Sequence, residues 1–161
     1  MTRHRFPLAL ILLTAIFCSG CGTQPLTSGP APDFTLDSLH GDAVTLSALA
    51  GQVAVLDFWA TWCSPCVEGL DHLQQMHERY ADQGLVVLAI NVGEDREEAA
   101  EFVADHGYTF TVLLDADGRV SDAYGVQGIP HTLIVDWEGE VHYVPGGAED
   151  VEDTLRNLLV E

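Results

Sequence analysis

Apolar and polar residues follow one another along this 161-residue chain in a pattern that predicts alternating strands and helices. The apolar runs 53–59 and 85–91 are short and rich in β-branched residues, which is typical of buried strands. Helical spacing of apolar residues predicts helices over 63–83, 96–106 and 149–160. The other predicted elements are a hairpin from 31–36 and 43–46, a helical turn at 47–51, a strand at 108–114, a helical turn at 120–124 and a second hairpin from 131–135 and 140–144.

This order of elements predicts an α/β fold with a mixed central β-sheet flanked by helices on both faces. An N-terminal β-hairpin precedes the core, and a strand–helix insertion lies between residues 85 and 114. The chain is long enough for one domain with its own core.

The first residues do not fit that domain. A basic opening, Arg3-His4-Arg5, precedes an apolar run at 6–17 that is too short to span a bilayer comfortably. The segment resembles a bacterial lipoprotein signal in which Cys21 is lipidated, although Cys18 stands where that pattern has leucine. Ordinary signal cleavage and an uncleaved anchor are the alternatives. We therefore expect a signal at 1–21, a flexible tether at 22–32 and the folded domain at 33–161.

The net negative charge of the chain disfavours some classes of binding partner. The chain has 25 acidic and 6 basic residues, no lysine, and a formal net charge of −19. Removal of residues 1–20 leaves 4 basic residues and a charge of −21. Nucleic acid and anionic lipid headgroups are therefore not expected as partners, and the acidic surface is interpreted first as a source of solubility.

The chemistry lies where the strand 53–59 meets the following helix. Cys63 and Cys66 are three positions apart there, and the helix terminus favours a thiolate on the first of them. No second cysteine pair follows at zinc-ligand spacing, so redox chemistry is favoured over a metal site. Cys63 is the expected nucleophile, Cys66 the resolving thiol, and Trp62 a neighbour at the client-binding surface. Cys18 and Cys21 have the same spacing but no helix terminus.

With this motif the segment 31–161 resembles the thioredoxin superfamily, and more narrowly its TlpA/ResA-like thiol-disulfide oxidoreductases. The resemblance implies a thioredoxin fold and a cis peptide bond before Pro130 in Gly128-Ile129-Pro130. The backbone of Ile129 would then pair with a client peptide. It also implies no cofactor.

Two carboxylates are candidates for proton transfer. Asp57 interrupts an apolar strand and matches the buried aspartate of thioredoxin, and Glu94 matches the active-site glutamate of ResA-like proteins. A solvated loop acid is the alternative for Glu94, because Asp95, Glu97 and Glu98 follow it. His131 is interpreted as a packed histidine in preference to a metal ligand or a group that tunes the cysteine pKa.

These residues predict an extracytoplasmic protein-disulfide reductase, and the resemblance adds cytochrome c maturation, a membrane thiol transporter as electron donor, and a membrane-anchored monomer in the cell envelope (the periplasm if Gram-negative). A disulfide oxidase or isomerase and a copper-binding chaperone are the alternatives. A peroxiredoxin is disfavoured because Leu56 and Ala60 occupy the proline and threonine positions of its Pro-x-x-x-Thr-x-x-Cys frame.

Overall fold

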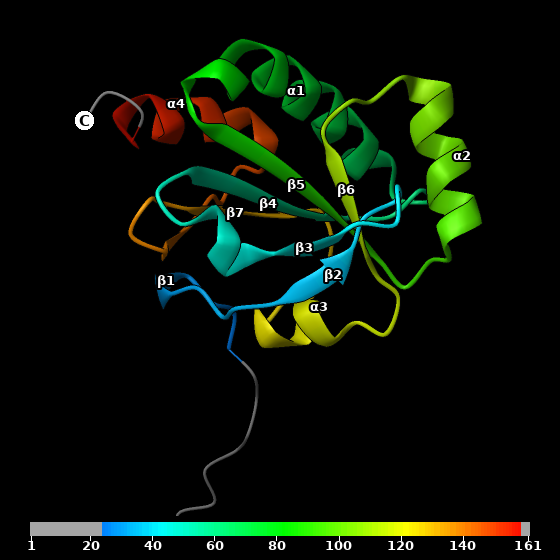
Figure 1. The fold of residues 1–161 in the computed structure, drawn as a ribbon, viewed down its shortest axis with the longest axis horizontal. Helices are drawn as coiled ribbons and strands as arrows, with labels where there is room; N and C mark the ends of the chain where they lie inside the picture. The colour runs from blue at the N-terminus through cyan, green and yellow to red at the C-terminus, as the bar shows by residue number, and fades with distance from the viewer. Residues whose placement is uncertain (1–23, 159–161) are drawn as a thin grey trace, which may run out of the picture.

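The computed structural model describes residues 24–158, which form a six-stranded mixed sheet, a two-stranded sheet and the helices that cover them (Figure 1). The strand order in the large sheet is β1-β8-β7-β4-β5-β6. In chain order the elements are β1 (Ser28–Pro30), β2 (Thr35–Asp37), β3 (Ala43–Thr45), η1 (Leu46–Leu49), β4 (Val53–Trp59), α1 (Ser64–Tyr80), η2 (Ala81–Gln83), β5 (Leu85–Val92), α2 (Arg96–His106), β6 (Thr111–Asp115), α3 (Arg119–Ala123), β7 (His131–Val135), β8 (Glu140–Tyr143) and α4 (Ala148–Leu158).

Strand β4 lies inside the sheet, and all seven of its residues are buried. It runs parallel to β5 and antiparallel to β7, so that Phe58 pairs with Ile90 on one side and with His131 on the other. The carboxyl ends of β4 and β5 therefore meet the amino end of β7 at one edge of the sheet. Cys63, Glu94 and Pro130 follow or precede these strand ends, so the topology gathers them at this edge.

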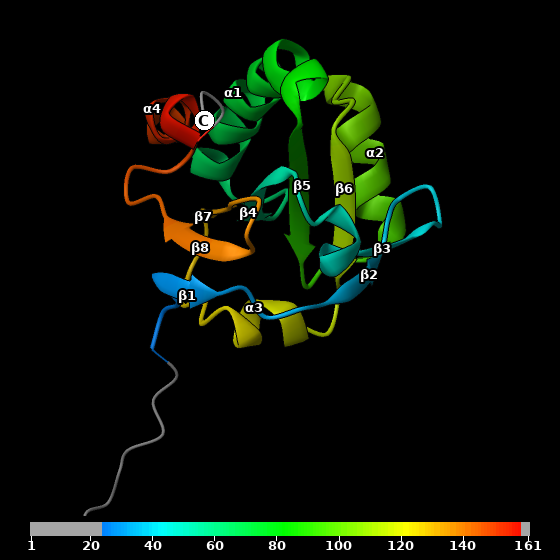
Figure 2. The same cartoon turned by 60° about the vertical axis from the view of Figure 1, so that its left-hand side comes forward.

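Alternate residues of each strand face two separate cores. Odd-numbered positions of β4, such as Val55 and Trp59, pack with apolar side chains of α1, α2 and α4. Even-numbered positions, such as Leu56 and Phe58, pack against α3, η1 and the β2–β3 hairpin. Figures 1 and 2 show α1, α2 and α4 on one side of the sheet and α3 with the small hairpin on the other.

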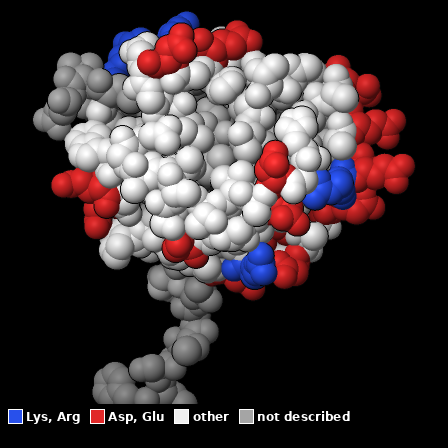
Figure 3. Space-filling view, in the orientation of Figure 1, with Lys and Arg blue, Asp and Glu red and all other residues white. Residues whose placement is uncertain are grey.

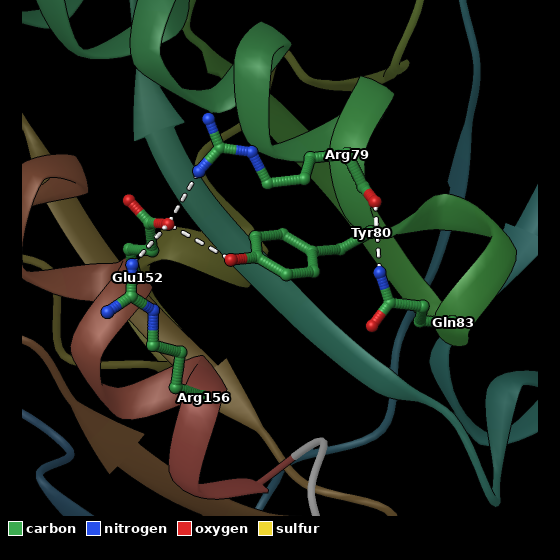
Figure 4. Close-up of polar contacts among 5 residues, drawn as sticks. All are labelled: Arg79, Tyr80, Gln83, Glu152 and Arg156. Atoms are coloured by element: carbon green, nitrogen blue, oxygen red, sulfur yellow. Dashed lines mark hydrogen bonds and ion pairs between the residues drawn. The ribbon is translucent and has the colours of Figure 1, made fainter.

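Helix α4 packs against α1 through buried apolar side chains and one cluster of polar side chains. Val151 and Leu155 are fully buried in the core beneath both helices. At the surface, Oε1 of Glu152 accepts hydrogen bonds from Arg79 (2.7 Å), the Tyr80 hydroxyl (3.0 Å) and Arg156 (3.1 Å) (Figure 4). Exposed ion pairs contribute little to stability, so the buried leucine and valine carry most of this contact.

The predicted mixed sheet flanked by helices is confirmed, as is the N-terminal hairpin, which forms β2 and β3. Three predicted spans, 53–59, 96–106 and 131–135, coincide with β4, α2 and β7. Strand β6 begins three residues later than predicted, because Tyr108 and Phe110 pack into the core ahead of any strand pairing. The signal at 1–21, with Cys18 and Cys21, lies outside the described residues.

The segment expected as a flexible tether is wrong in part. Ser28–Pro30 forms β1, which pairs antiparallel with β8 in the large sheet. Ahead of it, the backbone N–H of Leu26 donates to the Tyr124 carbonyl (3.1 Å), and Thr27 accepts from Tyr143 (3.3 Å). The sequence gives no sign of this, because backbone groups of an edge strand make the pairing and side chains add little. Since β1 is antiparallel to β8, the described chain enters the domain at the edge of the sheet where β4 ends.

Acidic side chains gather in groups on the surface, and the middle of the face drawn in Figure 3 is mostly uncharged. Figure 3 shows them concentrated at the right-hand edge, where α2 lies in Figure 1, and α2 carries Glu97, Glu98, Glu101 and Asp105. Two arginines donate hydrogen bonds to backbone carbonyls of the β2–β3 region. Arg96 donates to Ser38 and Leu39, and Arg119 donates to Thr35. Across residues 24–158, the helices are all too short or too polar to cross a membrane.

Candidate active site

Cys63 and Cys66 are joined by a disulfide at the start of α1, with sulfurs 2.01 Å apart. Cys63 is the N-cap of the helix, and its sulfur accepts a hydrogen bond from the backbone N–H of Cys66 (3.3 Å). Pro65 stands in the first turn, where its missing N–H costs nothing. Cys63 is 5% exposed and Cys66 is fully buried, so Cys63 is the more accessible residue of the pair.

Two apolar residues, Trp62 and Ile129, lie at the same end of the sheet as the cysteine pair. Trp62 is 71% exposed, so most of its ring faces solvent directly before Cys63. The peptide bond between Ile129 and Pro130 is cis, as the resemblance implies. Ile129 is partly buried and packs against both cores of the domain. Trp62 and Ile129 thus form an apolar rim at the end of the sheet that carries the cysteines.

Asp57 lies on the face of β4 that α1 covers, because it stands between Val55 and Trp59, which share a core with Cys66. Its side chain is almost entirely buried and accepts one hydrogen bond, from the hydroxyl of Thr132 to Oδ1 (2.7 Å). Burial raises the pKa of Asp57 to about 7, and the Thr132 hydrogen bond opposes that rise. This carboxyl can therefore gain and lose a proton near neutral pH.

Glu94 is buried too, so the alternative of a solvated loop acid is wrong. Its Oε2 accepts from the Thr61 backbone N–H (2.9 Å) and from Nδ2 of Asn91 (2.5 Å), and its Oε1 accepts from the Thr61 hydroxyl (2.5 Å). Thr61 precedes Cys63 by two residues. Glu94 thus fixes the loop that carries the cysteines to the end of β5.

Sequence reasoning missed three residues of this site: Thr61, Asn91 and Thr132. Each lies at a strand end or strand position that the topology brings to one edge. Asn91 pairs in register with Trp59, and Thr132 pairs in register with Asp57. A polar residue inside a predicted buried strand was the available signal for Asn91 and Thr132, as it was for Asp57.

His131 lies on the opposite face of the sheet from Asp57. Its ring stacks on Tyr143 (centroids 5.1 Å apart) and meets Phe58 edge-on, and burial lowers its pKa. It is therefore a packed histidine and does not approach the cysteines as a third metal ligand. Among the described residues, no three histidine, cysteine or acidic side chains are grouped closely enough to hold a metal ion.

A Cys-x-x-Cys pair at the N-terminus of a helix after a central strand, with a cis proline at the same end of the sheet, is the arrangement of a thioredoxin-fold oxidoreductase site. Comparison with known proteins agrees. Residues 27–144 match the AhpC/TSA family. The thiol-disulfide oxidoreductase ResA of Geobacillus kaustophilus is 37% identical over 136 residues, covering 84% of this chain and 78% of the relative. ResA of Bacillus subtilis is 34% identical over 155 residues, covering 94% and 85%.

Solved structures show the same fold. A candidate thiol:disulfide interchange protein DsbE from Chlorobium tepidum superposes with a TM-score of 0.76 at 34% identity, covering 84% of this chain and 99% of that one. A secreted thiol-disulfide isomerase from Corynebacterium glutamicum gives a TM-score of 0.70 at 31% identity, covering 81% and 86%. The chain belongs to the AhpC/TSA family, and within the thioredoxin superfamily it is a TlpA/ResA-like thiol-disulfide oxidoreductase.

Proposed function

We propose that this protein reduces disulfide bonds of client proteins, with Cys63 and Cys66 as the electron-carrying dithiol. The observation that supports this direction is electrostatic. Two carboxyl groups, Asp57 and Glu94, are buried around the pair, and the spacer Ser64-Pro65 supplies no positive charge. The described arginines are engaged elsewhere, in the β2–β3 region, with Asp117 and at the contact between α1 and α4. Only the helix terminus favours a thiolate, so the disulfide form is comparatively stable and the dithiol is a reductant.

The reaction needs two thiol–disulfide exchanges. The Cys63 thiolate attacks one sulfur of the client disulfide, and the other client sulfur leaves as a thiolate and takes a proton. Cys66 then loses its proton, attacks Cys63 and closes the internal disulfide while the client's second sulfur leaves. Two electrons pass to the client, which ends with two thiols.

Client binding follows from the rim around the sulfurs. As the resemblance to thioredoxin-like proteins implies, the backbone of Ile129, directly before Pro130, pairs with an extended client peptide as an added strand. Trp62, which directly precedes Cys63, offers an exposed apolar contact. This arrangement suits an unfolded or extended segment that carries the target disulfide.

We place the protein on the extracytoplasmic side of a membrane, in an envelope where disulfides persist. The sequence of residues 1–21 supports a signal with lipidation of Cys21. The described chain enters its domain at the edge that carries the active site, so an anchor just ahead of Gln24 would hold Cys63 near the membrane surface. That position suits a membrane thiol transporter as electron donor, and the apocytochrome c haem-site cysteines as clients.

The reduction potential of the pair tests the direction of electron flow. Full-length protein is equilibrated against a glutathione series and the dithiol fraction is determined by alkylation and mass spectrometry. We expect a potential more negative than about −210 mV, on the thioredoxin side of the known range. A potential above about −150 mV would instead make the protein an oxidant, and efficient reshuffling of scrambled ribonuclease at an intermediate potential would make it an isomerase.

A further inference from the structure

Asp57 depends on a single hydrogen-bond donor. The Thr132 hydroxyl is 2.7 Å from Oδ1, both residues are buried, and the two face each other in the antiparallel pairing of β4 with β7. Among the described residues, no other side chain or backbone group bonds to this carboxyl, and Oδ2 has no such partner. Thr132 itself is held in place by the sheet, where its carbonyl accepts from the Val144 backbone N–H (3.2 Å).

We propose that Thr132 is a positioning residue for disulfide exchange: its hydroxyl holds Oδ1 of Asp57 and leaves Oδ2 to take the proton of the Cys66 thiol. The inference rests on the proposed function. It assigns to β7 a role in proton transfer, in addition to the role of Pro130, which directly precedes the strand. It also explains why a polar side chain occupies the fully buried position opposite Asp57.

In the mixed disulfide between Cys63 and a client, the Cys66 S–H bond breaks and its proton passes to Oδ2 of Asp57. The sulfur of Cys66 forms a bond with that of Cys63, and the bond from Cys63 to the client breaks. The departing client thiolate takes a proton, and Asp57 returns its own to solvent. Because the proton is carried on Oδ2, Oδ1 has no hydrogen of its own and can accept the Thr132 hydroxyl hydrogen bond in both states of Asp57.

The surroundings of Asp57 leave Thr132 as its main polar influence. Burial raises the pKa of Asp57, and the only opposing contribution is the Thr132 hydrogen bond, with none from a charged group. The apolar neighbours of Asp57 on this face of the sheet include Val55, Ala89 and Ile134, which do not titrate. The titratable members of the same core are the two cysteines and Tyr108, with Tyr80 packed at its margin. Glu94 is bound to Thr61 and Asn91, and His131 lies on the other face of the sheet.

The test uses full-length protein in detergent and compares Thr132→Val, Thr132→Ser and the matched control Thr45→Val. Thr45 shares a hydroxyl–hydroxyl hydrogen bond with Thr35 in the exposed hairpin, far from the cysteines in the fold. The primary readout is the infrared band of the protonated Asp57 carboxyl, assigned by its loss in Asp57→Asn and followed from pH 5 to pH 9. The second readout is the pH dependence of single-turnover reduction of insulin disulfides.

Loss of the Thr132 hydroxyl removes a donor to the charged form, so Thr132→Val should raise the midpoint of the band by about one pH unit. Insulin reduction below the midpoint should fall about tenfold. Thr132→Ser should restore both, and Thr45→Val should change neither. An unmoved midpoint in Thr132→Val, or equal shifts in the valine and serine variants, would overturn the inference even if insulin is reduced. Failure of the unmodified protein to reduce insulin would overturn the proposed function, whatever the infrared midpoint does.

Discussion

Asp57 and Glu94 are both buried carboxyl groups beside one cysteine pair, yet their surroundings differ. Asp57 accepts one hydrogen bond inside a strand, and its pKa is raised to about 7. Glu94 accepts from three donor groups, supplied by Thr61 and Asn91, at the end of β5. The carboxyl of Asp57 can therefore exchange a proton, whereas both oxygens of Glu94 already accept hydrogen bonds.

The difference teaches that burial alone does not assign a carboxyl its role, because the number of donors around it matters as much. A carboxylate with several donors is a structural acceptor, and here it fixes the loop before Cys63. A carboxyl with a single donor in an apolar core keeps a proton easily and can pass it on. We therefore expect proton transfer from Asp57 and loop positioning from Glu94.

The largest effect is expected from Cys66→Ala. Without a resolving thiol the mixed disulfide with insulin should accumulate, and turnover should fall by about three orders of magnitude, since the second exchange is lost. When each carboxyl variant is combined with Cys66→Ala, the two carboxyls should affect the rate of adduct formation differently. Asp57→Asn should leave the trapping rate within about twofold, because its proton partner is gone, whereas Glu94→Gln should slow trapping about tenfold.

Non-reducing gels and intact mass spectrometry measure the adduct over time. If Asp57→Asn slows trapping as much as Glu94→Gln does, then Asp57 acts on Cys63 and the division of roles is wrong.

A second difference is expected in stability against pH. The pKa of Asp57 is about 7 in the folded protein and near 4 when unfolded, so the folded state binds more protons between these values. The free energy of unfolding should therefore fall as pH rises from about 4 to about 7. Above about pH 7 Asp57 is ionised in both states, and the destabilisation caused by its buried charge is complete. Asp57→Asn should remove it and stabilise the protein by about 2–4 kcal/mol at pH 8, with little change at pH 4.

Glu94→Gln should act in the opposite sense at pH 8. Its amide would place an N–H group against donors from Thr61 or Asn91, which should cost about 1–3 kcal/mol. Urea unfolding of the oxidised protein measures both variants. Destabilisation of Asp57→Asn at pH 8 would contradict the comparison.

The smallest effect is expected from Thr61→Val. The variant loses the hydroxyl bond to Glu94 but keeps the backbone N–H bond to the same carboxylate. Insulin reduction should fall about threefold with no movement of its pH midpoint, because the loop loosens while Asp57 is unaffected. Stopped-flow tryptophan fluorescence gives both quantities, and a shifted midpoint would show that the loop also controls the proton carrier.

Much of this site could be predicted from the sequence, and the exceptions have a physical cause. Asp57 is visible because a charge interrupts an apolar strand. Glu94 sits among Asp95, Glu97 and Glu98, and its contact with Thr61, 33 positions away, exists only because β4 and β5 are parallel neighbours. The local pattern of apolar and polar residues does not predict which distant strands pair.

The missed strand β1 has a related cause. Ser28, Gly29 and Pro30 show no alternation of apolar and polar side chains, and their pairing with β8 uses backbone groups. The cis bond before Pro130 and the core packing of His131 were anticipated in the sequence analysis, the first through the resemblance to thioredoxin-like proteins. What escaped prediction is therefore long-range backbone pairing and the polar contacts that it creates.

The most direct test of the account is the pH dependence of single-turnover insulin reduction in the unmodified protein, Asp57→Asn and Glu94→Gln. The thiols titrate as well and are coupled to the carboxyls, so the differences between the profiles carry the information. We predict an acidic limb with a midpoint near pH 7 that disappears in Asp57→Asn and persists, with a lower plateau, in Glu94→Gln. A limb that persists in Asp57→Asn and disappears in Glu94→Gln would contradict the account and make Glu94 the proton carrier.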